Sequence, residues 1–256
     1  MNQHLNQPVN SSGLLSTRGL SLSFGGVVAA DAIDFDLRPG ERLAVIGQNG
    51  AGKTTFINIC TGYLKPTSGQ VFFDGVNITG QSPRAITRLG IGRSFQLPQV
   101  FTEHTVRECM MLAASAVKQR HGFLLPLSQA VDAAEVDETL DLLQLASRTR
   151  DLAGSLPEGQ RKLLDVAMAL VLRPKLMIMD EPTSGVSTDE KHDLMAVLMR
   201  ALDERKVTSI FVEHDIDIVR RYATRLCAWI AGRIAADGSP EEVLRDPMVV
   251  KNVIGE

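Results

Sequence analysis

The stretch GQNGAGKT at residues 47–54 is the strongest indication of how this chain folds. It follows residues 43–46, a short apolar run of the kind that forms a buried strand, and a helical pattern continues from Thr54 to Cys60. In such a strand–loop–helix unit, the glycines let backbone N–H groups curl around phosphate oxygens, and the helix adds its positive end. The stretch therefore predicts a loop that binds nucleotide phosphates within an α/β domain.

Two side chains of this loop have the clearest expected roles. Lys53 would reach the β- and γ-phosphates, and the Thr54 hydroxyl would bind Mg²⁺. The residues predicted to contact the nucleotide here are Gly47, Asn49, Gly50, Ala51, Gly52, Lys53, Thr54 and Thr55.

Residues 176–179 (LMIM) form a second apolar run, which Asp180 and Glu181 follow directly. The carboxyl ends of the strands line the ligand site in open α/β sheets. At this position Asp180 suits indirect Mg²⁺ binding, through the ligands of the metal, and Glu181 suits polarising the water that attacks the γ-phosphate. The alternative is an ordinary strand end, followed by a turn at Pro182.

A third apolar run, residues 210–212, leads to His214. At the same sheet edge, an imidazole could hydrogen-bond the γ-phosphate or the attacking water. Taken alone, a histidine here is more often structural. Its position after the acidic strand favours the functional interpretation.

The composition predicts a folded protein, and we expect it to be cytoplasmic. The 256 residues are 44% hydrophobic, enough to bury a core in one large domain or in a domain with a subdomain. The formal net charge of −3 gives no overall attraction to nucleic acid, and we expect no nucleic-acid partner.

The cysteines and the absence of targeting patterns bear on the compartment. Cys60, Cys109 and Cys227 lack metal-ligand spacing and suit core thiols in a reducing compartment. We find no signal-peptide pattern and no apolar stretch of membrane-spanning length, so a membrane role would require a partner.

The remaining pattern predicts β-structure first and then helices inserted into the α/β domain. Residues 14–37 have the pattern of extended chain broken at Gly25-Gly26. The capping-box pair Thr105 and Glu108 opens a region of helical spacing, and Ser239 opens a final helix. We predict a flexible polar tail over residues 1–13 and one domain over 14–256, with an inserted helical subdomain over 99–158 and a C-terminal helical extension over 239–256.

Together with LPEGQ at residues 156–160, these motifs resemble, in type and order, the nucleotide-binding subunits of ABC transporters. The family signature, usually written LSGGQ, occupies the position of LPEGQ, and the resemblance runs from about Leu14 to the end of the sequence. It implies a P-loop NTPase (RecA-like) α/β core with an N-terminal antiparallel β subdomain and an inserted α-helical subdomain. It also implies an ATPase that binds ATP and Mg²⁺ and works as a dimer.

The resemblance adds roles for five further residues. Gln96, in RSFQ at residues 93–96, matches the glutamine that contacts Mg²⁺ and the attacking water and senses the transmembrane partner; the alternative is a loop amide. Phe24 matches the aromatic residue that stacks on adenine; the alternative is a buried strand aromatic. The signature residues Pro157, Gly159 and Gln160 would contact the ATP held by the second subunit of the dimer.

Three stretches narrow the resemblance to the ATPase subunits of branched-chain amino acid importers. They are YLKPTSG at residues 63–69, the long segment after Gln96, and GSPEEV at 238–243 with Asp246-Pro247. Such importers combine two different ATPase chains, two transmembrane permease subunits and an external solute-binding protein. The resemblance thus implies a heterodimer at the cytoplasmic face of the inner membrane, with the solute selected by other subunits. The alternatives are the ATPase of a lipid or lipopolysaccharide exporter and a soluble ABC ATPase that works as a switch.

The segment after Gln96 is the expected contact with the permease. Leu97, Val100 and Phe101 are apolar, and with the helical region they would form a groove for a helix of the membrane subunit. The alternative is that these side chains belong to the core.

The signature departs from the family pattern. Pro157 replaces the serine whose hydroxyl and N–H face the γ-phosphate, and proline has neither donor. Glu158 replaces a small residue and adds negative charge. We therefore expect the ATP site completed by this signature to be weak or inactive in hydrolysis, unless this subgroup tolerates a loose signature. Ser187 replaces an aspartate found in many relatives, and with Glu190 it matches a capping box.

Overall fold

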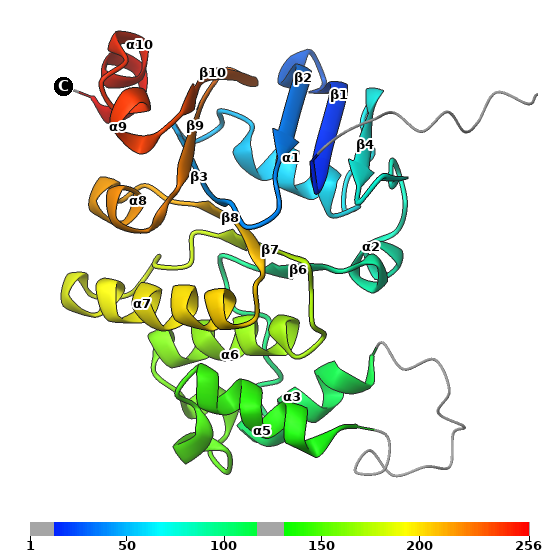
Figure 1. Cartoon of the computed structure of the whole chain (residues 1–256), viewed down its shortest axis with the longest axis vertical. Helices are drawn as coiled ribbons and strands as arrows, with labels where there is room; N and C mark the ends of the chain where they lie inside the picture. The colour runs from blue at the N-terminus through cyan, green and yellow to red at the C-terminus, as the bar shows by residue number, and fades with distance from the viewer. Residues whose placement is uncertain (1–12, 117–130, 256) are drawn as a thin grey trace, which may run out of the picture.

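The computed structural model describes residues 13–116 and 131–255. The predicted polar tail, apart from Gly13, and residues 117–130 of the predicted helical subdomain lie outside the described residues. In Figure 1 the antiparallel sheet lies at the top of the molecule, and the helices α3 (Val106–Ser115) and α5 (Ala133–Leu142) lie at the bottom.

The strand before the phosphate loop, β3 (Arg42–Gly47), lies inside a six-stranded sheet of order β10-β9-β3-β8-β7-β6. Strands β6, β7, β8, β3 and β9 run parallel to one another, and β10 pairs antiparallel with β9. Every residue of β7 and β8 is buried, as expected of parallel strands covered on both faces. The remaining bounds are β6 (Ile91–Ser94), β7 (Leu176–Asp180), β8 (Thr208–Val212), β9 (Arg225–Ile230) and β10 (Arg233–Gly238).

A second, antiparallel sheet of order β2-β1-β4-β5 forms the N-terminal part of the fold. Its strands are β1 (Leu15–Phe24), β2 (Val27–Leu37), β4 (Ser68–Phe73) and β5 (Val76–Asn77). The β1–β2 hairpin turns at Gly25-Gly26, where both residues have positive φ. Glycine adopts this conformation without steric cost, which explains the break in the extended pattern.

Helix α1 (Lys53–Cys60) lies between the two sheets (Figure 1). Its Phe56 ring packs against Phe35 of β2 and Trp229 of β9, with ring centroids 5.3 and 4.9 Å away. The other helices are α2 (Pro83–Leu89), α6 (Glu158–Leu170), α7 (Thr188–Glu204), α8 (Ile216–Tyr222), α9 (Pro240–Val243) and α10 (Pro247–Val249), with 3₁₀ turns at Ala146–Arg148 and Ala153–Ser155 and a π-helical turn at Val250–Ile254.

The six-stranded sheet separates two hydrophobic cores. Met177 and Met179 of β7 point into the core shared with α6, α7 and the lower helices, whereas Leu176 and Ile178 point into the core shared with α1 and the antiparallel sheet. This alternation follows from the two-residue period of a strand. It anchors β7 on both faces, so that Asp180 emerges at a fixed position.

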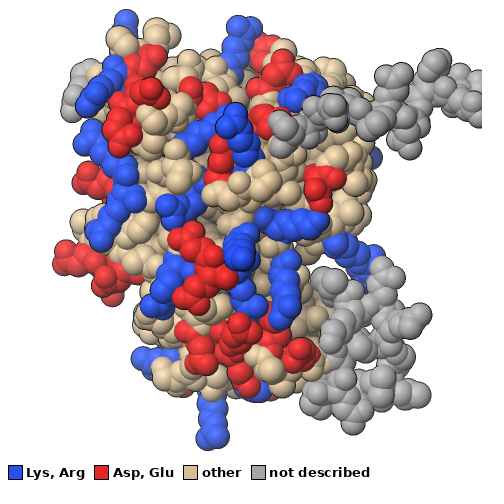
Figure 2. Space-filling model, viewed as in Figure 1, with Lys and Arg blue, Asp and Glu red and all other residues tan. Residues whose placement is uncertain are grey.

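The lower helices are tied to the rest of the domain by ion pairs that two arginines make with the Glu135 carboxylate, which is 9% exposed. Glu135 of α5 accepts a hydrogen bond from Arg173 Nε at 2.7 Å and lies 3.0 Å from Arg205 Nη2. Arg205 is also 3.3 Å from Glu138. Figure 2 shows acidic side chains gathered over this lower part of the molecule, with Lys and Arg bordering them.

Two of the three capping boxes expected from the sequence are formed. Thr105 and Glu108 cap α3, and Ser239 and Glu242 cap α9, with both reciprocal contacts present. The third is wrong, because the Ser187 side chain accepts no backbone N–H. Its hydroxyl instead donates to the Glu190 carboxylate at 2.7 Å.

The three cysteines Cys60, Cys109 and Cys227 are buried and free, as expected of core thiols. Burial raises the pKa of each thiol, which leaves them poorly reactive. Within residues 13–116 and 131–255, no helix has both the length and the apolar character needed to cross a membrane.

Candidate functional site

The phosphate loop wraps from the end of β3 into α1. At Gly52 φ is 102°, and an added Cβ would lie 2.1 Å from the Ala29 carbonyl oxygen of β2, so only glycine fits. The Lys53 ammonium donates to the carbonyl oxygens of Gly47 and Gln48 at 2.6 and 2.9 Å. Burial lowers the pKa of Lys53, and the nearby carboxylates of Glu181 and Asp180 oppose this shift. The acidic strand end therefore faces the loop, as predicted.

Asp180 ends β7 as a buried carboxylate. Burial raises its pKa, and the Arg93 guanidinium, 3.8 Å away, is the largest opposing influence. The next residue, Glu181, has φ of 50°, a left-handed conformation that costs a non-glycine residue about 1–3 kcal/mol. This backbone reversal turns Glu181 out of the strand.

Three of the predicted residues meet at the Glu181 side chain. Gln96 Nε2 donates to Oε2 of Glu181 at 2.7 Å, and His214 Nε2 lies 3.0 Å from Oε1. Because an ionised carboxylate only accepts hydrogen bonds, this contact requires the proton on Nε2 of His214. Both oxygens of Glu181 are thus oriented by neighbours, and the Gln96 Oε1 atom stays available as a metal ligand.

Lys162, which sequence reasoning missed, holds the backbones of two of these residues. It lies near the start of α6 and is 4% exposed. Its ammonium donates to the carbonyl oxygens of Gln96 and Glu181 at 3.0 and 3.2 Å. A lysine two residues after the signature has no sequence feature that separates it from a solvated helix residue.

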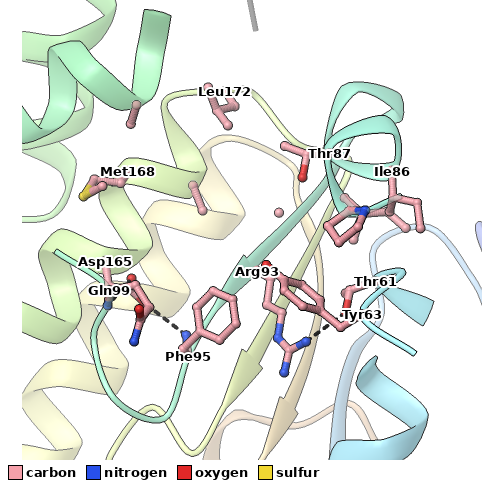
Figure 3. A pocket seen from close by; sticks show the side chains of 15 residues that line it. Thr61, Tyr63, Ile86, Thr87, Arg93, Phe95, Gln99, Asp165, Met168 and Leu172 are labelled. Carbon is pink, nitrogen blue, oxygen red and sulfur yellow. Dashed lines mark hydrogen bonds between the residues drawn. The ribbon is translucent and has the colours of Figure 1, made fainter. Parts of the chain in front are cut away.

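Asp165, one turn further along α6, fixes the Gln96 segment from the other side. Its two oxygens accept the backbone N–H groups of Phe95 and Gln99, each at 3.0 Å (Figure 3). Burial raises the pKa of Asp165 from 3.8 to about 6, against the opposing effect of these N–H groups. The segment that carries Gln96 is therefore held by two charged residues of one helix.

Asp165→Asn is expected to remove a pH dependence of stability between pH 3.8 and about 6. In this window the unfolded chain loses the Asp165 proton and the folded protein keeps it. The folded state binds more protons, so the free energy of unfolding falls as the pH rises, by on the order of 3 kcal/mol. Chemical denaturation of both proteins across this window measures the effect. A constant difference between them would contradict it.

Glu213, also missed, fixes the turn that follows Glu181. Its Oε1 atom accepts from the N–H and the hydroxyl of Thr183 at 3.0 and 2.8 Å. The carboxylate is 3% exposed, and it also accepts the His214 N–H at 3.2 Å. One buried side chain thus holds the backbone two residues after Glu181 and the backbone of His214 itself.

The signature lies at the first turn of α6. Pro157 occupies the cap position without a side-chain hydrogen bond, and the Arg161 N–H donates to its carbonyl oxygen at 3.0 Å. Glu158 forms an ion pair with Arg161, which offsets the negative charge expected to disturb a nucleotide. Gly159 and Gln160 line a surface groove with Pro157 and residues after β7, and the phosphate loop lines a different one.

Phe24 lies at the tip of the β1–β2 hairpin and is 48% exposed. The alternative reading as a buried strand aromatic is wrong. The hairpin adjoins the phosphate loop through β2, where Ala29 contacts Gly52 and the Asp31 N–H donates to Gly232 at 3.0 Å. An exposed ring on this hairpin is available for stacking.

The donor set fits Mg²⁺ bound together with a nucleotide. Thr54 is exposed at the start of α1, and Asp180 and Gln96 offer oxygen atoms. Among the described residues, no group of three or more His, Cys, Asp and Glu side chains could form a metal cage. Mg²⁺ prefers this arrangement, because it keeps several waters and binds few protein ligands beside substrate phosphates.

Comparison with known proteins gives the family. The sequence profile described as ABC transporter matches residues 30–184. The chain belongs to the ABC transporter family. It is 35% identical over 246 residues to a probable branched-chain amino acid transport ATP-binding protein LivG of Archaeoglobus fulgidus, covering 94% of this chain and 95% of the relative. It is 33% identical to the high-affinity branched-chain amino acid transport ATP-binding protein BraF of Pseudomonas aeruginosa, covering 96% and 99%.

The fold is similar to a solved ATP-binding cassette of an ABC transporter in its ADP conformation. The TM-score is 0.81 at 32% identity, and the match covers 95% of this chain and 99% of the other. The predicted family resemblance and fold class are therefore confirmed.

Proposed function

We propose that this ABC protein is the ATP-binding and ATP-hydrolysing subunit of a membrane importer for branched-chain or other small amino acids or related organic solutes. The observation that carries the proposal is the meeting of Gln96 and His214 on Glu181, beside a phosphate loop and a buried Asp180. The similarity to relatives named for branched-chain amino acid transport favours this solute class.

In the proposed reaction, water attacks the γ-phosphate in line with the leaving ADP. The loop at residues 47–54 binds the phosphates, and Lys53 exchanges its carbonyl contacts for phosphate oxygens. Thr54, Gln96 and Asp180 hold Mg²⁺, which when bound neutralises phosphate charge. Glu181 releases one of its present contacts to accept a hydrogen bond from the water.

The complete site needs a second ATPase subunit. Phe24 stacks on adenine, and Thr55 adds a contact at the end of the phosphate loop. In the proposed dimer Pro157, Gly159 and Gln160 face the ATP of the partner, which is a different ATPase chain. Such a heterodimer tolerates one weak ATP site, and Pro157 is the reason to expect that the site completed by this signature is weak.

The permease contact is proposed beside the Gln96 segment. Leu97 and Phe101 are 74% and 47% exposed, so they are not core residues. Gln99, which lies between them in the sequence, lines a groove between α2 and α6. Permease subunits bound here would hold the chain at the cytoplasmic face of the inner membrane, with a solute-binding protein as an indirect partner.

The test uses a tagged Glu181→Gln chain, which should trap the ATP-bound dimer. We would identify the proteins that co-purify from detergent-solubilised membranes with Mg-ATP. Recovery of a different ATPase chain and two polytopic subunits supports the importer. Recovery of one homodimer with an exporter-type membrane pair favours the lipid or lipopolysaccharide exporter. Recovery of soluble partners alone overturns the transport function and favours the soluble switch.

Pro157→Ser is expected to raise ATP turnover of the dimer. Serine restores a hydroxyl and an N–H toward the γ-phosphate, and hydrogen bonds to charged groups contribute about 1.5–3 kcal/mol each. At the affected site this corresponds to on the order of ten-fold or more in turnover. Pro157→Ala, which restores the N–H alone, is the matched control and should give a smaller gain. Unchanged phosphate release would show that the signature tolerates proline.

A further inference from the structure

Arg93 of β6 lies in an aromatic clamp. Its guanidinium carbon is 4.7 Å from the centroid of the Phe95 ring and 5.1 Å from that of Tyr63. The two rings meet edge to face, with centroids 5.8 Å apart. Figure 3 shows both rings beside the Arg93 side chain. Stacking of this kind holds a planar guanidinium more firmly than it would hold a lysine ammonium.

Two nitrogen atoms of Arg93 reach α1 and the end of β7. Nη1 donates to Asn58 Oδ1 at 2.6 Å and to Thr61 Oγ1 at 2.9 Å. Asn58 belongs to α1, the helix that begins at Lys53. Nη2 lies 3.8 Å from Asp180 Oδ2, and both side chains are less than 10% exposed. Arg93 thus connects the phosphate-loop helix with the end of β7.

The other side of the clamp borders the groove between α2 and α6. This groove has a volume of about 210 Å³, and Tyr63 and Phe95 line it with Ile86, Met168 and Leu172. Tyr63 is 52% exposed, so its ring can be reached from outside. The same two rings therefore face the groove and hold the guanidinium beside Asp180.

We propose that Arg93 is a positioning residue that links the occupancy of this groove to the Mg²⁺-binding carboxylate Asp180. The inference rests on the proposed function, in which the permease contacts the groove and Asp180 serves Mg-ATP. A side chain that enters the groove orders or displaces the Tyr63 ring. Because the guanidinium packs on that ring and is hydrogen-bonded to α1, it transfers the change to Asp180.

The test measures Mg²⁺-dependent binding of a fluorescent ATP analogue to the purified full-length chain. Arg93→Met removes a charge about 4 Å from Asp180, so we expect the Mg²⁺ concentration for half-maximal binding to change by about five-fold or more. Binding in EDTA should change by less than about two-fold, because Arg93 is not one of the residues proposed to contact the nucleotide. Arg93→Lys should bring the Mg²⁺ concentration for half-maximal binding part of the way back to the wild-type value. Arg88→Met, which removes an exposed positive charge on α2, is the matched control.

Tyr63→Leu tests the groove side. In the wild-type background it should shift the Mg²⁺ concentration for half-maximal binding by about two- to three-fold. In the Arg93→Met background it should leave that concentration unchanged, because the effect passes through Arg93. Full additivity of the two changes, or an Arg93→Met shift no larger than that of Arg88→Met, overturns the proposal. Lys53→Met distinguishes failure of this proposal from failure of the proposed function. If it leaves nucleotide binding intact, the proposed function fails instead.

Discussion

Glu181→Gln is expected to lower ATP turnover by about three orders of magnitude while nucleotide affinity stays within about two-fold, a loss within the range for removing a positioned general base. Glutamine preserves the size of the side chain and keeps an oxygen for the Gln96 contact at 2.7 Å. It lacks the negative charge that polarises the water. Phosphate release and equilibrium binding of ATP measure the two quantities separately.

Glu204→Gln is the matched control, because Glu204 is an exposed carboxylate at the end of α7. It should leave turnover unchanged. Retention of more than about a tenth of wild-type turnover by Glu181→Gln would remove Glu181 from the role of base. His214→Ala separates orientation from chemistry, since it frees Oε1 of Glu181 and leaves the carboxylate in place.

Local sequence signals predicted most of the fold because each has a local physical cause. The apolar run at residues 176–179 reads as a strand because both faces of β7 are buried. The Thr105 and Ser239 boxes predict helix starts because their partners lie three residues away. The Ser187 prediction failed because the Ser187 side chain accepts no backbone N–H. The contact between its hydroxyl and the Glu190 carboxylate does form, as the equivalent contact does in both complete boxes. The domain limits at 99–158 and 239–256 remain predictions.

The site was predictable only where motif residues carry the chemistry. Lys53, Asp180 and Glu181 follow apolar strands, and their positions at one sheet edge follow from the parallel order. The residues that hold them in position could not be predicted in this way. Lys162 reaches Gln96 across 66 residues of sequence, and Asp165 reaches Gln99 across the same separation. These contacts depend on how α6 packs against β6, which no local pattern encodes.

Lys162→Met is expected to lower kcat by about 10- to 100-fold with a change in KM for ATP of less than about three-fold. The substitution keeps an unbranched chain in a buried position but leaves the carbonyl oxygens of Gln96 and Glu181 without their donor. Two charge-assisted hydrogen bonds contribute about 1.5–3 kcal/mol each, and part of this loss would appear as misplacement of the carboxylate. Steady-state hydrolysis rates measured against ATP concentration give kcat and KM separately.

Lys162→Arg distinguishes positioning from mere packing, since it keeps a buried cation and should recover much of kcat. Lys175→Met, at an exposed lysine, should have no effect. If kcat falls only in proportion to the folded fraction measured by thermal unfolding, Lys162 acts on stability alone.

A larger fall in kcat would have a consequence for the dimer. Lys162 lies on the same first turns of α6 as the signature, so a movement of that helix start in the proposed dimer would reach Gln96 and Glu181 directly. Closure on the partner's ATP and assembly of this chain's own catalytic pair would then be one event.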